Sequence, residues 1–88
     1  MEVDIIKQRI GIASSVTVYD YDIDLYVRDC IMDMRDSGVP EETLAREDPR
    51  VVTAVTLYVK AHIGNDRSDT SRYLSLYRQK VSRLILDE

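Results

Sequence analysis

The spacing of apolar residues is the feature that most constrains this chain. Over most of its length, apolar side chains recur every three or four residues, which places them on one face of an α-helix. No segment shows the regular alternation of apolar and polar residues that is typical of a half-buried strand. The spacing therefore predicts an all-α fold, a small bundle of about four helices of which three form the core.

The first two predicted helices lie in the acidic half of the chain. Residues 3–10 place Val3, Ile6 and Ile10 on one side and Lys7 and Arg9 on the other, and Gly11 is expected to end this helix. The second helix is expected to take Asp20 as its N-cap and to close at Ser37-Gly38. Its apolar stripe is Ile23, Val27, Cys30, Ile31 and Met34, whereas Asp29, Asp33 and Asp36 are expected to face solvent.

Two further helices follow a polar, acidic connector, residues 39–48. We expect this connector to be the most mobile interior segment, with a single helical turn starting at Pro40-Glu41-Glu42. Asp48-Pro49 is typical of an N-cap followed by proline at the first helical position, and Gly64-Asn65 should end the third helix. Capping residues at 66–71 precede a fourth helix that runs almost to the C-terminus. The stripes are Val51 or Val52, Val55, Tyr58, Val59 and His62 in the third helix, and Tyr73, Leu74, Tyr77, Val81, Leu84 and Ile85 in the fourth.

The size of the chain leaves room for one domain, residues 1–88. The longest uncharged stretch in an apolar pattern, residues 51–59, is about half of the roughly 20 residues that a membrane-spanning helix needs. The acidic start, Met1-Glu2-Val3-Asp4, lacks the basic and apolar regions of a signal peptide. We therefore expect no membrane anchor and no export signal.

Three arrangements were weighed as sites for metal or catalysis. Asp20, Asp22 and Asp24 have the opening spacing of a calcium loop, but Leu25 and Ile31 stand where that loop needs glycine and glutamate, so we interpret the aspartates as helix-capping residues. Cys30 and His62, each the only residue of its type, lie on apolar stripes and are interpreted as packing residues. With only three glycines there is no phosphate-binding loop. No cofactor, no metal and no enzymatic activity are predicted.

Charge is unevenly distributed along the chain. Residues 1–48 hold 12 acidic and 5 basic residues, whereas residues 49–88 hold 4 acidic and 7 basic ones, for a total of −4. All six aromatic residues are tyrosines, which have a polar hydroxyl as well as an apolar ring. The overall acidity, with a pI near 4.9, argues against a nucleic-acid footprint on the basic half. Both features are instead typical of a protein–protein interface.

Three pieces of the sequence resemble a known family. The first piece is Thr17-Val18-Tyr19-Asp20 leading to Ile23, with Asp33-Met34 and Ser37-Gly38-Val39 at the far end of that predicted helix. The second is Asp48-Pro49 followed by Tyr58-Val59-Lys60-Ala61-His62-Ile63-Gly64-Asn65. The third is made of Asp66, Asp69, Arg72-Tyr73 and Tyr77. Together they are similar to the small head-tail connector, or DNA-packaging, proteins of tailed bacteriophages and prophages. Ile63 departs from the aromatic residue usual there, and a C-terminal tail that grips the portal in some relatives is expected to be missing or reduced.

The resemblance implies a structural protein of the virion, made in the bacterial host cytoplasm. It implies a homo-oligomeric ring, of about 12 or 13 subunits, below the portal protein. Such a ring extends the DNA channel, lets DNA pass without specific binding, and receives the tail or a stopper protein. The alternative that the residues leave open is a small helical interaction or regulatory protein with no role in the virion.

The charge pattern leads to a hypothesis about the contacts within such a ring. A ring joins one face of each subunit to a different face of the next, and opposite charges on the two faces favour that arrangement. We therefore expect the acidic second helix to meet the basic fourth helix of a neighbour, with tyrosines at the contact. The candidate interface residues are Asp29, Asp33, Asp36, Arg72, Arg78, Arg83, Tyr73 and Tyr77.

Overall fold

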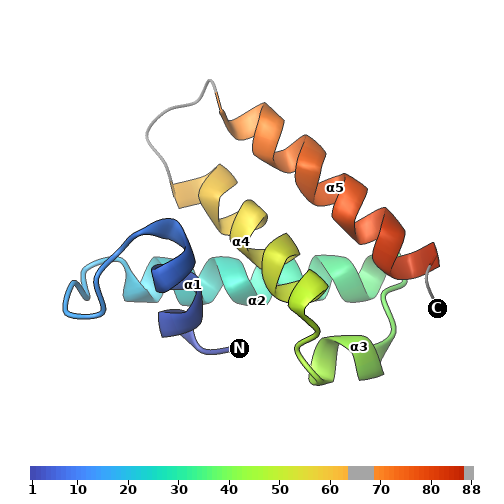
Figure 1. Cartoon of the computed structure of the whole chain (residues 1–88), viewed down its shortest axis with the longest axis horizontal. Coiled ribbons are helices and arrows are strands. Elements are labelled where there is room, and N and C mark those ends of the chain that lie inside the picture. Colours follow the sequence, from blue (N-terminus) through green and yellow to red (C-terminus); the bar gives the residue numbers. More distant parts are fainter. Residues whose placement is uncertain (64–68, 87–88) are drawn as a thin grey trace.

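The computed structural model of the chain describes residues 1–63 and 69–86. Within these ranges it contains five α-helices and no strand, which confirms the all-α prediction (Figure 1). The predicted helix end at Gly64-Asn65 and the capping positions at 66–68 lie outside the described residues. The helices are α1 (Val3–Ile10), α2 (Asp20–Ser37), α3 (Glu41–Ala45), α4 (Pro49–Ile63) and α5 (Thr70–Leu86).

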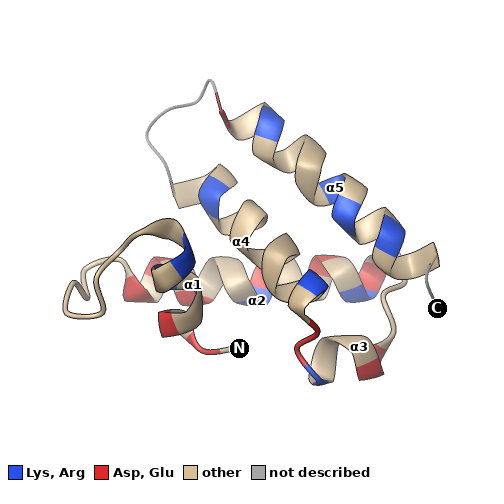
Figure 2. Cartoon of the chain, in the orientation of Figure 1, with Lys and Arg blue, Asp and Glu red and all other residues tan. Residues whose placement is uncertain are grey.

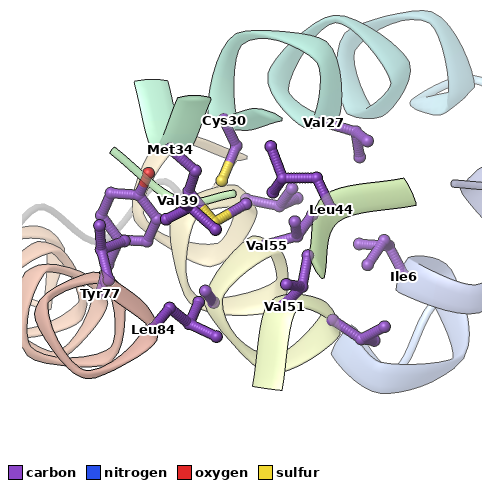
Figure 3. Close-up of a cluster of buried hydrophobic side chains, with 14 of the residues drawn as sticks. Ile6, Val27, Cys30, Met34, Val39, Leu44, Val51, Val55, Tyr77 and Leu84 are labelled. Atoms are coloured by element: carbon purple, nitrogen blue, oxygen red, sulfur yellow. The ribbon is translucent and has the colours of Figure 1, made fainter. Parts of the chain in front are cut away.

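Helix α4 is the centre of the fold. It crosses α2, runs alongside α5 over much of its length and contacts α1 as well (Figure 1). Its valines are buried against side chains from all of these helices, so the β-branched sequence is held helical by packing rather than by intrinsic propensity (Figure 3). The buried apolar residues are Ile6, Ile23, Val27, Cys30, Met34, Val39, Leu44, Val51, Val52, Ala54, Val55, Val59, Ala61, Tyr77, Val81 and Leu84.

The connector between α2 and α4 contributes more to the core than its polar sequence suggests. Its predicted helical turn is confirmed as α3, and Val39, Thr43 and Leu44 are buried. Gly38 turns the chain out of α2 with φ 109°, a left-handed conformation that favours glycine. The N–H of Val39 then donates to the carbonyl of Met34 at 3.0 Å. This turn places the Val39 side chain in the core.

The start of α4 confirms the predicted cap. The carboxylate of Asp48 accepts a hydrogen bond from the backbone N–H of Arg50 at 2.9 Å, and Oδ1 also accepts one from Nε of Arg50 at 3.1 Å. Pro49 occupies the first helical position, where its missing N–H leaves no bond unmade. In the part of the chain that the structure describes, no helix is long and apolar enough to cross a lipid bilayer.

The cap of α4 leads to a prediction about acid stability. The hydrogen bonds from the Arg50 side chain and backbone lower the pKa of Asp48 to about 2, whereas an aspartate in an unfolded chain titrates near ~4. A lowered pKa stabilises the fold above the unfolded value, and this contribution is lost as the pH falls through the folded value. Asp48→Asn, which can still cap the helix, should therefore be less stable than wild type at pH 5 and equally stable near pH 2. Urea unfolding across this range measures the difference, and a difference independent of pH would contradict the assignment.

Candidate assembly surfaces

Helix α5 presents an exposed basic face. It has four basic residues and no acidic one (Figure 2). Arg72, Arg78 and Arg83 are exposed, Lys80 is half-buried, and none of the four forms an ion pair with any residue in the described part of the chain. These cations are available to a partner.

The arginines lie at the two edges of this face. Successive residues of an α-helix are rotated by about 100°, so Arg72 and Arg83 lie on one edge and Arg78 lies about a third of a turn away, on the other. Ser75 and Ser82 fall between the edges and are exposed. Gln79 and Leu86 are exposed between the same edges. We call this surface, which has a guanidinium group on each side, the shelf.

Helix α2 has the opposite charge, with six aspartates and two arginines (Figure 2). Asp29 and Asp36 are exposed and have no ion-pair partner among the described residues. Asp33 differs, because it is half-buried and its carboxylate accepts a hydrogen bond from the Tyr77 hydroxyl at 2.7 Å. The expectation that Asp33 faces solvent is therefore wrong, because the hydroxyl on α5 draws this carboxylate toward the helix interface.

Tyr77 is a core residue. Its side chain is 1% exposed and its ring packs edge-on against Tyr58, with the hydroxyl directed toward α2 (Figure 3). Burial raises the pKa of Tyr77, and the hydrogen bond to Asp33 raises it further. Burial also raises the pKa of the neighbouring Cys30 thiol to about 12, which keeps it protonated and unreactive. In this subunit, Tyr77 and Asp33 bind each other across 44 residues of sequence.

The remaining candidate tyrosine, Tyr73, lies at the boundary between α4 and α5. It is half-buried, and Nζ of Lys60 lies 5.6 Å from the centre of its ring, within the range of a cation–π contact. His62 is exposed on α4, stacks on Tyr58 with ring centres 4.3 Å apart, and bonds through Nδ1 to the Tyr58 carbonyl at 2.8 Å. His62, predicted on the apolar stripe, therefore packs against Tyr58 at the surface rather than in the core.

An open groove of about 490 Å³ lies beside the N-terminus, with apolar walls from Met1, Val27 and Met32. The charged groups on its rim are already paired, Arg28 with Asp24 and Arg35 with Glu41. Among the described residues, no three His, Cys, Asp or Glu side chains are arranged to hold a metal ion.

Lys7 is the residue that sequence reasoning placed wrongly. Helical spacing put it on the outer side of α1, but its side chain is only 1% exposed. The chain after α1 folds back over it: Nζ donates to the carbonyls of Ser14 at 3.1 Å and Val16 at 2.6 Å, and lies 2.8 Å from Oδ1 of Asp20. An isolated lysine among apolar residues gives no sequence signal for such burial, because the partners are mostly backbone oxygens.

The Lys7 contact also explains why the predicted N-cap of α2 is wrong. Tyr19 occupies the cap position and has no side-chain cap hydrogen bond, whereas Asp20 is the first residue of the helix. Oδ1 of Asp20 is buried, with the Lys7 ammonium as its counter-ion, although the side chain as a whole is 39% exposed. The aspartate therefore neutralises a buried charge instead of capping.

The loop that Lys7 holds, residues 11–19, carries apolar side chains on its outer side. Val18 is 76% exposed, and Tyr21, just inside α2, is 78% exposed. In Figure 1 this loop projects beyond the start of α2, at the end of the molecule away from α5. The exposed large apolar residues of the loop and the first turns of α2 are Val16, Val18, Tyr19, Tyr21 and Leu25.

The sequence was then compared with known proteins. The family model of the phage connector protein matches residues 3–88. The chain belongs to the phage connector protein family. Neither the curated proteins nor the solved structures contain a match to it. The phage connector family is structural, and membership of it indicates contacts with other phage proteins.

The Lys7 contact in this connector is expected to contribute strongly to stability. Lys7→Met keeps the length of the side chain but leaves Oδ1 of Asp20 and two loop carbonyls without their donor, which should lower the free energy of unfolding by about 2–4 kcal/mol. Arg9→Met on the exposed side of the same helix is the control and should change it by less than about 0.5 kcal/mol. Urea unfolding of the three proteins measures both effects. Equal stability of the two variants would show that the buried ammonium is not important.

The hydrogen bond between α5 and α2 gives a second stability prediction. Tyr77→Phe keeps the ring in the core but removes the donor to the Asp33 carboxylate, so we expect a loss of about 1.5–3 kcal/mol. Tyr73→Phe is the matched control, because its hydroxyl forms no hydrogen bond to any described residue. Thermal or urea unfolding distinguishes the two substitutions, and similar losses in both would contradict the role assigned to the Tyr77 hydroxyl.

Proposed function

We propose that this connector is the subunit of a ring at the head-tail interface of a tailed bacteriophage or prophage. The ring lies below the portal protein, extends the DNA channel, and attaches the tail or a stopper protein. The observation that carries the proposal is the separation of unpaired charge within one small family member, with α5 purely basic and α2 strongly acidic.

Charge separation of this kind suits a closed ring. Subunits in a ring contact one another head to tail, through two different surfaces. A basic surface repels a second basic surface and attracts an acidic one, so the pairing of unlike faces is favoured. Of the candidate residues, the exposed Asp29, Asp36, Arg72, Arg78 and Arg83 and the half-buried Tyr73 are those we propose at subunit contacts.

The overall charge also suits a channel through which DNA moves. A net charge of −4 repels the DNA backbone over the subunit as a whole, which opposes tight binding of phosphates. DNA should therefore slide past the ring without being bound specifically. The chain is made in the host cytoplasm and becomes part of the virion, with the portal protein on one side and the tail or stopper on the other.

Reversing charge on α5 tests the ring. Arg78→Glu with Arg83→Glu should weaken assembly at least about tenfold, because acidic surfaces would then face each other, while the exposed positions leave the subunit folded. Arg78→Lys with Arg83→Lys retains the charge and is the matched control. The mass of the assembled species, measured by native mass spectrometry or light scattering with and without the portal protein, should correspond to about 12 or 13 subunits for wild type and the control.

Two outcomes would contradict this function. One is full assembly of the charge-reversed protein, which would show that α5 is not at a subunit contact. The other is a chain that forms no multi-subunit species with or without the portal and is absent from purified virions. That second result would favour a small helical regulatory protein instead.

A further inference from the structure

The loop at residues 11–19 is held in place by a buried charged group, the ammonium of Lys7. Lys7 has 1% of its side chain exposed, and its ammonium binds Ser14, Val16 and Asp20. Burying a lysine is unfavourable unless its charge and hydrogen bonds are fully compensated. Here the compensation comes almost entirely from the loop and the first residue of α2, so the result of burying Lys7 is a fixed loop.

What the fixed loop displays is apolar and aromatic. Val18 and Tyr21 are each more than three-quarters exposed, and Leu25 follows Tyr21 by one helical turn. Asp22, also exposed, lies among them and has no ion-pair partner in the described part of the chain. A surface that is already ordered before binding loses less conformational entropy when a partner docks. We call this surface, made of Val16, Val18, Tyr19, Tyr21, Asp22 and Leu25, the tip.

The tip is too far along α2 to contact the basic face of its own subunit. Asp33 of α2 and Arg78 of α5 line the same open pocket of about 180 Å³ within one subunit. The part of α2 near Asp33 therefore already lies beside α5 of the same subunit. Tyr21 precedes Asp33 by 12 residues, which is about 18 Å along a helix. Figure 1 shows the loop at the opposite end of α2 from this pocket.

We propose that the tip of one subunit docks on the exposed face of α5 in a second copy of this chain. This inference rests on the proposed function and specifies which surfaces meet in the ring. The tyrosine rings of the tip lie over the serines of the α5 shelf, between the guanidinium groups at its edges, and the Asp22 carboxylate pairs with one of those arginines. Arginine stacks well on aromatic faces and binds carboxylates in a planar geometry, so the tip has both groups that an arginine-edged shelf accepts.

Charge complementarity is the reason for choosing a second copy as the occupant. The basic face of α5 has no acidic neighbour on its own helix, and no ion pair with any described residue. The tip contributes aspartate and tyrosine but no basic residue. Because the two surfaces lie on different elements at different ends of the subunit, their contact is head to tail, as a closed ring requires.

Photo-crosslinking in mixed assemblies tests this contact. Tyr21 is replaced by photoreactive benzoylphenylalanine in an isotopically heavy chain, which is assembled with light wild-type chain, with the portal protein present. After irradiation, mass spectrometry identifies the crosslinked peptides. We expect crosslinks from position 21 of the heavy chain to residues 70–86 of the light chain, and the isotope label separates them from crosslinks within one subunit. The same substitution at Glu42, which is exposed on α3 and belongs to neither proposed surface, is the control and should give no such crosslinks.

The outcomes separate this inference from the proposed function. One outcome is a multi-subunit species in which position 21 crosslinks to the portal protein, to another element of the second copy, or to nothing. In that case the proposed tip contact is wrong, but the proposed ring is not contradicted. If no multi-subunit species forms, the proposed function fails and the contact fails with it. Crosslinks between position 21 and α5 of the other copy support both.

Substitutions at the tip give a second, independent measurement. Val18→Ser combined with Tyr21→Ser removes two exposed side chains without touching the core, so the subunit should stay folded while assembly weakens about tenfold or more. Glu42→Ser removes an exposed side chain from α3, outside both proposed surfaces, and should leave assembly unchanged. Equal effects of the two variants would overturn the inference.

Discussion

Burial of α4 is the constraint on which the rest of the structure depends. This helix is rich in valine, which does not favour an isolated helix, and it is covered by α1, α2 and α5 together. Each of these helices must therefore turn its apolar stripe toward α4. Most of their polar and charged side chains are left facing outward. In a chain of 88 residues, the same packing that makes the core thus also creates the charged surfaces.

The two polar contacts inside this packing have different consequences. The Tyr77 hydroxyl on α5 donates a hydrogen bond to the Asp33 carboxylate on α2 and so joins these two helices. The Lys7 ammonium binds the carbonyls of the loop after α1 and the carboxylate at the start of α2, and so holds the loop against α2. The first contact supports the core, whereas the second shapes an exposed end of the subunit. The partners of the buried Lys7 therefore identify the exposed loop, residues 11–19, as an ordered surface.

The uneven charge of the chain takes on a clearer meaning in three dimensions. Along the sequence it divides an acidic half from a basic half, but in the folded subunit part of the acidic helix lies beside the basic one. The Asp33 carboxylate already accepts a hydrogen bond from Tyr77 of its own subunit. The first turns of α2, with their aspartates, lie far from α5 (Figure 1). Membership of the phage connector family indicates that the protein interacts with other phage proteins.

Local spacing was sufficient to predict much of this protein. The all-α class, the extent of α1, the start of α4, the turn at Gly38 and the Asp48 cap all follow from residues within a few positions of one another. Charge and tyrosine content likewise indicated an interaction protein before any contact was known. The burial of Lys7, the role of Asp20 as its counter-ion and the pairing of Tyr77 with Asp33 needed the folded chain. Helical periodicity describes one segment at a time, whereas these contacts join separate segments, and only tertiary packing brings their atoms within bonding distance.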